Sequence, residues 1–240
     1  MADYIMADVQ GDINSFNRLL DKIAFKSGED RLIINGNILD IRSNGIKILF
    51  TVKDMVEKGD AVMIKGNHEL FIQMCMEGTL TERNWVRSYD ESMLKELQKL
   101  EKDKQDELLT FIKGLPLYIE RETPKFGKTI ITHTGLMNDY LVAGPDECID
   151  AEASIRNAVN NDEYGYLISA DIHYWGHEKL NKIDKYIICG HVPTYQLGPE
   201  YKGRIFRSKK YMDIDAGSGY RERGGRLACY SIDEDKEFYV

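Results

Sequence analysis

The first part of the chain alternates short apolar runs with polar loops and with stretches whose apolar residues recur at helical spacing. The apolar runs are residues 4–8, 31–35 and 61–64, and helical spacing is clear in residues 14–25 and 46–58. Strands that alternate with helices in this way predict βαβ units in a parallel or mixed sheet. Because parallel strands end at the same edge of a sheet, the three polar loops should meet there.

The pattern changes after a charged, amphipathic segment, residues 91–113, which predicts one or two helices. Most of the later apolar runs are typical of strands: 117–120, 128–132, 185–189, 211–215, 226–232 and 237–240. A polar, Asn-rich stretch with some helical spacing lies among them at 146–180 and is interpreted as a lid-like insertion. We therefore expect one domain, residues 1–240, that carries this insertion.

Composition narrows the class of protein. The formal charge of −8 argues against general nucleic-acid binding, which depends on an excess of Lys and Arg. The four cysteines are widely spaced, which predicts neither a disulfide framework nor a zinc knuckle. Without a signal peptide or an apolar run of membrane-spanning length, the sequence predicts a soluble, cytoplasmic protein with no membrane partner.

Polar residues with ligand chemistry follow five of the predicted strands. The five segments are Asp8–Asp12, Gly36–Asp40, Gly66–Glu69, Thr132–Gly135 and Cys189–Pro193. Any one of them could be an ordinary turn or helix cap. Five in order, each at a strand end, favour a site of oxygen and nitrogen ligands, which suits Mn, Fe, Zn or Mg.

In this order the motifs resemble those of the calcineurin-like metallophosphoesterases: Asp-x-His, Gly-Asp-x-x-Asp-Arg-Gly, Gly-Asn-His-Glu, His-x-Gly and Gly-His-x-x. Within that family the chain resembles first the bacterial and phage serine/threonine protein phosphatases, and second the diadenosine-tetraphosphate hydrolases. The resemblance implies an α/β fold in which helices flank a two-sheet β-sandwich, the four-layer architecture of the family. It also implies one or two divalent ions, Mn first, and a phosphorylated protein or a small-molecule phosphate ester as substrate.

The resemblance also assigns roles to individual residues. The first metal would be bound by Asp8 and Gln10, the second by Asn67, His133 and His191, and Asn37 would bridge the two. His68 would protonate the leaving oxygen, oriented by Asp40. For the substrate phosphate the candidates are Arg42, one place later than the family's arginine, and Arg221 or Arg223 from a loop, residues 219–225, that is longer than the family's. These could equally be ordinary exposed loop residues.

Three of these positions depart from the family pattern. Gln10 stands where the family has histidine, Asn37 where it has the bridging aspartate, and Arg42 comes one place late. Because an amide has one neutral ligating oxygen and an NH2 group that cannot ligate, the first metal site should weaken. One sequence does not tell whether Asn37 is natural or engineered.

Three functions stay open at this point. The first is hydrolysis of phosphate monoesters. The second, cleavage of dinucleoside polyphosphates, draws support from Gln10. The third is a catalytically impaired phosphatase-like module that binds a phosphorylated partner without turning it over, and the departures favour it.

Other residues with ligand chemistry have simpler interpretations. His173 and His177 have the spacing of helical metal ligands, but Tyr174 and Trp175 between them favour a packed segment. Cys189 lies in an apolar run and is interpreted as a packing residue rather than a nucleophile. Asp215 is expected to support the site from behind the ligands.

Overall fold

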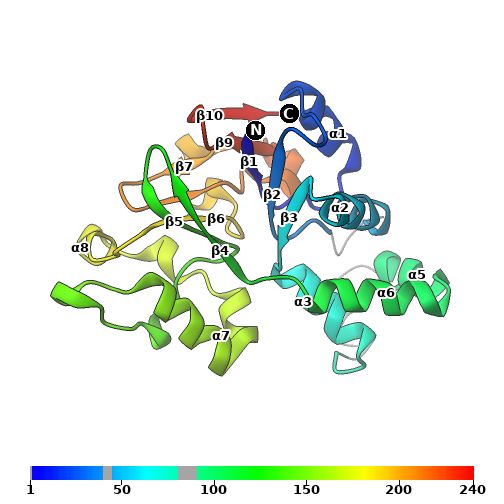
Figure 1. Cartoon of the computed structure of the whole chain (residues 1–240), viewed down its shortest axis with the longest axis horizontal. Coiled ribbons are helices and arrows are strands. Elements are labelled where there is room, and N and C mark those ends of the chain that lie inside the picture. The colour runs from blue at the N-terminus through cyan, green and yellow to red at the C-terminus, as the bar shows by residue number, and fades with distance from the viewer. Residues whose placement is uncertain (1, 40–44, 81–90) are drawn as a thin grey trace.

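The computed structural model describes residues 2–39, 45–80 and 91–240, with the side chains of 91–94 left aside. Two five-stranded sheets lie face to face, and helices cover their outer sides (Figure 1). This four-layer α/β arrangement confirms the fold class that the sequence predicts.

The first sheet has the strand order β10-β9-β1-β2-β3. Its parallel part follows from the three repeated units. β9 joins it antiparallel to β1, and β10 pairs antiparallel with β9 at the edge. The bounds are β1 Asp3–Met6, β2 Arg31–Asn35, β3 Ala61–Ile64, β9 Ala228–Ser231 and β10 Lys236–Tyr239. Helices α1 (Ile13–Lys22) and α2 (Ile46–Lys58) connect the parallel strands.

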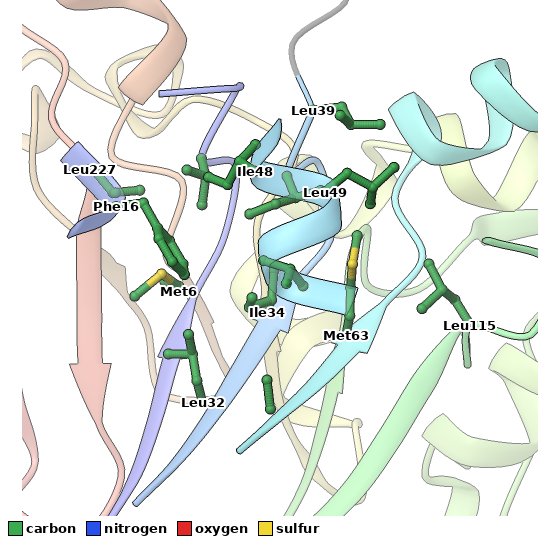
Figure 2. Packing of buried hydrophobic residues seen from close by; sticks show 14 of the residues in the cluster. Met6, Phe16, Leu32, Ile34, Leu39, Ile48, Leu49, Met63, Leu115 and Leu227 are labelled. Atoms are coloured by element: carbon green, nitrogen blue, oxygen red, sulfur yellow. The ribbon is translucent and has the colours of Figure 1, made fainter. Parts of the chain in front are cut away.

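Side chains on the parallel strands alternate between two cores, as the pleat requires. Met6 and Ile34 face the helices, where Phe16 of α1 and Leu49 of α2 pack over the sheet (Figure 2). Ile5, one residue before Met6, belongs instead to the core between the two sheets. Both faces of the sheet are therefore buried, which explains why its strands appear in the sequence as continuous apolar runs.

The second sheet has the order β4-β5-β6-β8-β7. The middle strands β5, β6 and β8 are parallel, and an antiparallel strand lies at each edge. The bounds are β4 Tyr118–Thr123, β5 Gly127–Thr132, β6 Tyr186–Cys189, β7 Phe206–Arg207 and β8 Tyr211–Asp213. The sequence did not predict β7, because two residues are too few to show any alternation.

The remaining helices cover the outer sides of the sandwich. Residues 91–113 form two helices, α5 (Glu91–Lys99) and α6 (Lys102–Lys113), and α3 (Asn67–Met76) follows β3. Residues 146–180 are largely helical, with α7 (Ala151–Ile168), η3 (Asp171–Tyr174) and α8 (His177–Asn181). Further 3-10 turns are η1 Asn138–Tyr140, η2 Pro145–Glu147, η4 Thr194–Gln196, η5 Pro199–Tyr201 and η6 Ser218–Arg223.

The 146–180 segment packs on the second sheet. Ile155 of α7 and Ile172 of η3 share a core with Ile130 and Ile187 of the strands. In the portion of the chain that the structure describes, no helix combines the length and apolar character that crossing a bilayer requires.

Candidate metal centre

Strained backbone turns aim the ligand side chains at one point. Asp8, Gln10, Asn37 and His191 all have positive φ, at 53°, 59°, 50° and 75°. This region is uncommon for residues other than glycine and costs free energy, so it persists only where the surrounding structure enforces it. Four such residues at strand ends therefore indicate a site built for its geometry.

Glycines beside the ligands leave room for this convergence. A Cβ on Gly36 would lie 2.5 Å from His133 Nδ1, and one on Gly66 would lie 2.4 Å from Asn37 Oδ1. These approaches are shorter than any real Cβ contact, so the glycines of both motifs are required for the site to close.

Asn67 Oδ1 is the centre of the site. It lies 3.1 Å from His133 Nε2, 3.1 Å from His191 Nδ1 and 3.1 Å from Asn37 Nδ2. Asn67 begins α3, His133 follows β5 and His191 follows β6, so both sheets contribute.

The orientation of the Asn37 amide is fixed by its neighbours. The His68 backbone N–H donates to Asn37 Oδ1 at 3.1 Å, so Oδ1 must be the oxygen. Asn37 Nδ2 then donates to Asp8 Oδ1 at 2.9 Å and to Asn67 Oδ1 at 3.1 Å. Because Nδ2 carries hydrogens, the Asn67 atom that faces it must also be oxygen.

The His133 imidazole presents a lone pair to this oxygen. His133 Nδ1 lies 2.9 Å from the carbonyl oxygen of Asn35, to which it donates, so Nε2 is unprotonated in the neutral ring. Burial lowers the pKa of His133 well below its usual value, and burial likewise lowers the pKa of His191 to about 4.

The lone pair of His133 Nε2 faces the Asn67 oxygen with no proton between them, which is the signature of a cation site, and His191 Nδ1 lies at the same distance from that oxygen. Ligands at about 2.1 Å from one ion lie roughly 3.0–3.4 Å apart, and the separations of 3.1 Å agree with this. Asn67, His133 and His191 therefore fit a divalent ion.

The first metal position fits less well. Asn37 directs an N–H group, and not an oxygen, at Asp8 Oδ1, while the His191 backbone N–H donates to Asp8 Oδ2 at 3.0 Å. Burial, the largest cause, raises the pKa of Asp8. The Gln10 side chain lies against Gly219 and makes no hydrogen bond within the described part of the chain. Asp8, Gln10 and Asn37 therefore do not form a first metal site that is bridged to the site at Asn67.

Glu69 is a structural residue of the site that the sequence analysis missed. Its buried carboxylate accepts from the backbone N–H groups of Gly66 and Asn37, both at 2.9 Å, and from Ile38 at 3.0 Å. Glu69 thereby connects the loop after β2 to the loop after β3. Its place three residues after Gly66, the N-cap of α3, is a capping-box signal that could have found it.

We expect Glu69→Gln to lower the free energy of unfolding by about 3 kcal/mol, because the amide NH2 would face backbone donors in either orientation. Urea unfolding followed by circular dichroism measures this loss. Glu222→Gln, at an exposed position, is the matched control. A loss no larger than that of the control would contradict the role assigned to Glu69.

His68 follows Asn67 at the start of α3. Its Nδ1 lies 2.8 Å from the Leu39 carbonyl oxygen, which orients the half-buried ring. Asp40, the expected orienting group, and Arg42 lie outside the described residues.

The two other expected phosphate ligands have different surroundings. Arg221 donates to Asp12 Oδ2 at 3.1 Å, to Ser15 Oγ at 2.6 Å and to the Val240 carbonyl oxygen at 3.0 Å. Its guanidinium is therefore already engaged beside α1. Arg223 is exposed and lies over the rings of Tyr195 and Tyr220.

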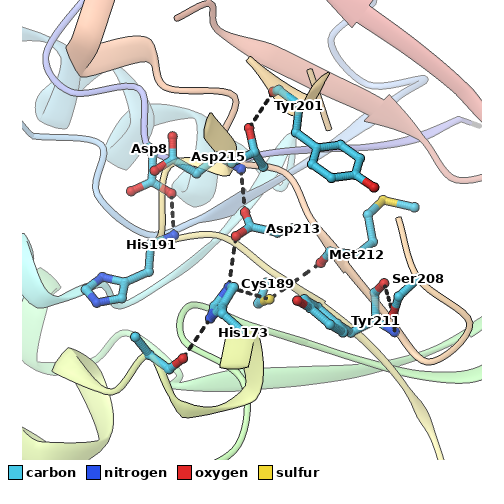
Figure 3. A network of polar contacts seen from close by, with 12 residues as sticks. Asp8, His173, Cys189, His191, Tyr201, Ser208, Tyr211, Met212, Asp213 and Asp215 are labelled. Carbon is cyan, nitrogen blue, oxygen red and sulfur yellow. Dashed lines mark hydrogen bonds and ion pairs between the residues drawn. The ribbon is translucent and has the colours of Figure 1, made fainter. Parts of the chain in front are cut away.

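The pair His173 and His177 does not form a site. His177 is exposed at the start of α8, whereas His173 is buried in η3. Asp215 is buried behind Asp8, where the charge of Asp8 adds to burial in raising its pKa (Figure 3).

Comparison with known proteins identifies the family. The family model described as calcineurin-like phosphoesterase matches residues 4–217. The chain belongs to this family. Calcineurin-like phosphoesterases use divalent metal ions, and the cluster of Asn67, His133 and His191 supplies ligands suited to one.

Individual relatives agree with this assignment. The symmetrical bis(5'-nucleosyl)-tetraphosphatase of Pasteurella multocida is 25% identical over 168 residues, covering 70% of this chain and 55% of the relative. That of Escherichia coli O1:K1 is 28% identical over 172 residues, covering 71% and 55%. The chain thus spans about 55% of the length of these relatives.

A solved structure shows the same fold. The serine/threonine phosphatase from Saccharomyces cerevisiae, which has similarity to human phosphatase PP5, superposes with a TM-score of 0.62. Identity is 15%, and the match covers 96% of this chain and 72% of that one. At this identity the likeness concerns the fold alone.

Proposed function

We propose that this calcineurin-like phosphoesterase is a metal-dependent phosphatase that hydrolyses phosphate monoesters with one firmly held divalent ion. The carrying observation is the approach of His133 Nε2 and His191 Nδ1 to Asn67 Oδ1, since a cation between these acceptors explains it. The oxygen and nitrogen set favours Mn, with Fe, Zn or Mg as alternatives.

The metal ion, His68 and Asn37 would have different roles in the reaction. A bound divalent ion would supply Lewis acidity to the phosphoryl group and to the attacking water. His68 Nδ1 lies 2.8 Å from the Leu39 carbonyl oxygen, which orients the ring, and we assign to His68 the proton transfer to the departing alkoxide. Asn37 Oδ1 accepts from the His68 backbone N–H and so fixes where α3 begins relative to the second loop.

The proposed substrate is a phosphorylated protein or a small-molecule phosphate ester. The resemblance of the motifs to those of the serine/threonine protein phosphatases supports the first, and the small, convergent ligand set admits both.

His68→Ala tests the proposal, because it removes the acid and leaves the metal ligands in place. We expect turnover of p-nitrophenyl phosphate with added Mn to fall by about 100-fold while bound Mn per chain stays unchanged. Steady-state kinetics and elemental analysis measure the two quantities. His177→Ala, at an exposed histidine, is the control. Equal losses of Mn and turnover would contradict the assignment of His68 as the acid.

A second candidate function is hydrolysis of dinucleoside polyphosphates. The relatives named bis(5'-nucleosyl)-tetraphosphatase support it. So does an exposed cluster in which Arg223 lies 5.6 Å from the ring centre of Tyr195 and 5.5 Å from that of Tyr220. Gly219 of the same loop lies against Gln10, so the cluster is close to the first metal position. Aromatic rings and a guanidinium are surfaces on which a nucleobase stacks.

Arg223→Ala separates the two candidates. For dinucleoside hydrolysis we expect kcat/KM on a bis(5'-nucleosyl) tetraphosphate to fall about tenfold, since a stacking contact is worth about 1–3 kcal/mol. Turnover of p-nitrophenyl phosphate should change less than twofold. Arg156→Ala, on α7, is the control. An equal effect on both substrates, or none, would remove the support that this cluster gives.

A further inference from the structure

A second group of metal-binding side chains lies beneath the strand-end site. It consists of His173 from η3, Cys189 from β6 and Asp213 from β8, whose ligand atoms all lie within 4.8 Å of one another. The side chains of His173 and Asp213 have no exposed area, and Cys189 is fully buried. Figure 3 shows the three side chains pointing toward one another.

The geometry around His173 is that of a ligand. Nδ1 lies 3.2 Å from the Ala170 carbonyl oxygen, to which it donates, so the lone pair of the neutral ring is on Nε2. Nε2 lies 2.8 Å from Asp213 Oδ2 and 3.7 Å from Cys189 Sγ. A metal-bound histidine commonly has its other ring N–H on a backbone carbonyl in this way.

Asp213 provides an independent observation. Its Oδ1 accepts from the Asp215 backbone N–H at 2.8 Å, whereas Oδ2 has no aligned hydrogen bond among the described residues. Among the described residues the close neighbour of this oxygen is His173 Nε2, at 2.8 Å but not aligned for a hydrogen bond. A fully buried carboxylate oxygen that no aligned donor satisfies is costly and requires an explanation. The oxygen is directed at the space that Cys189 Sγ and His173 Nε2 share.

The same geometry argues against a nucleophilic cysteine. A Cys–His–Asp relay uses both ring nitrogens, one toward the sulfur and one toward the carboxylate. In this cluster sulfur and carboxylate face the same nitrogen, while Nδ1 is on the Ala170 carbonyl. A relay is therefore excluded, and coordination to a common centre explains the arrangement.

We propose that His173, Cys189 and Asp213 bind a structural zinc ion. Zinc accepts nitrogen, sulfur and oxygen ligands together, and a tetrahedral ion separates N from S by roughly 3.6 Å, close to the observed 3.7 Å. The Met212 carbonyl oxygen, 3.5 Å from the sulfur, is a further oxygen at the site. The ion would fasten the 146–180 segment, through η3, to two strands of the second sheet.

Cobalt substitution tests this site separately from the strand-end site, which contains no sulfur. We expect the full chain loaded with Co²⁺ to show thiolate-to-cobalt charge-transfer absorption. Cys189→Ser should abolish the band, and Cys229→Ser, which changes the buried cysteine of β9, should retain it. His133→Ala should also retain the band, because it alters only the other site.

A direct affinity measurement adds a second readout. In the His133→Ala background, we expect Cys189→Ser to weaken Zn²⁺ binding at least about 100-fold by calorimetry, with the circular dichroism spectrum unchanged. Absence of the cobalt band in the unaltered chain, or its persistence in Cys189→Ser, would overturn the proposal. Unchanged Zn²⁺ affinity in the double variant would overturn it as well.

Discussion

Replacing Asn37 by Asp should raise bound Mn from about one to about two ions per chain and increase p-nitrophenyl phosphate turnover at least tenfold. Asn37 Nδ2 occupies the place between Asp8 Oδ1, at 2.9 Å, and Asn67 Oδ1, at 3.1 Å. A carboxylate oxygen there is an anionic ligand that can face two cations, whereas the N–H group can face none. Elemental analysis and steady-state kinetics on the same preparations measure both effects.

The metal-free Asn37→Asp protein should be less stable than the unaltered chain. The new carboxylate would lie beside buried Asp8, and two unpaired buried carboxylates repel each other. Added Mn should reverse this loss, which thermal unfolding with and without the ion would show. Asn161→Asp, at an exposed position of α7, adds the same charge away from the site.

Each outcome of the Asn37→Asp experiment has a clear meaning. A second ion together with turnover means that the site is intact apart from its bridge. A second ion without turnover contradicts the proposed phosphatase and favours a module that only binds a phosphorylated partner. Unchanged stoichiometry would contradict the inference that the Asn37 amide keeps the second ion out.

The fold was predictable wherever the local pattern decides the structure. Residues 31–35 and 46–58 form a strand and a helix with the predicted bounds, because Gly59 adopts the left-handed conformation that ends α2. The pattern of 91–113 could not decide between one helix and two. The structure places a break before Lys102, where Glu101 has an extended backbone.

The 146–180 segment shows where local pattern was insufficient. Its polar composition suggested a lid-like insertion, but Asp150 caps α7 by accepting from the Ala153 N–H at 2.9 Å. Ile155 and Ala158 then pack on the second sheet. The sequence showed some helical spacing here, but the apolar face is narrow, so the pattern did not predict that α7 packs on the second sheet. Whether the segment acts as a lid stays a prediction.

The site was predictable in its residue types and not in its contacts. Strand ends and the family resemblance indicated Asn67, His133 and His191, which the structure brings together. The bond from the Asn37 backbone to Glu69 joins residues 32 apart, and no local pattern encodes it. The direction of the Asn37 amide likewise depends on the His68 N–H, a donor from another loop.

His133→Ala should abolish both metal binding at the strand-end site and catalysis. The variant removes the buried nitrogen that faces Asn67 Oδ1 and leaves the ion two protein ligands, Asn67 and His191. We expect Mn affinity to fall at least about 100-fold, and turnover to fall with it. Mutating a group that only orients a metal ligand already lowers metal affinity about 10- to 100-fold, and removing the ligand itself should cost at least as much.

Isothermal calorimetry with Mn and the p-nitrophenyl phosphate assay measure these losses for His133→Ala. His133→Gln, which keeps a polar side chain of similar length, separates loss of the ligand nitrogen from loss of packing. His177→Ala controls for removal of an exposed histidine. If His133→Ala bound Mn as tightly as the control, the contact between His133 Nε2 and Asn67 Oδ1 would not mark a cation site. That result would also contradict the proposed metal-dependent reaction.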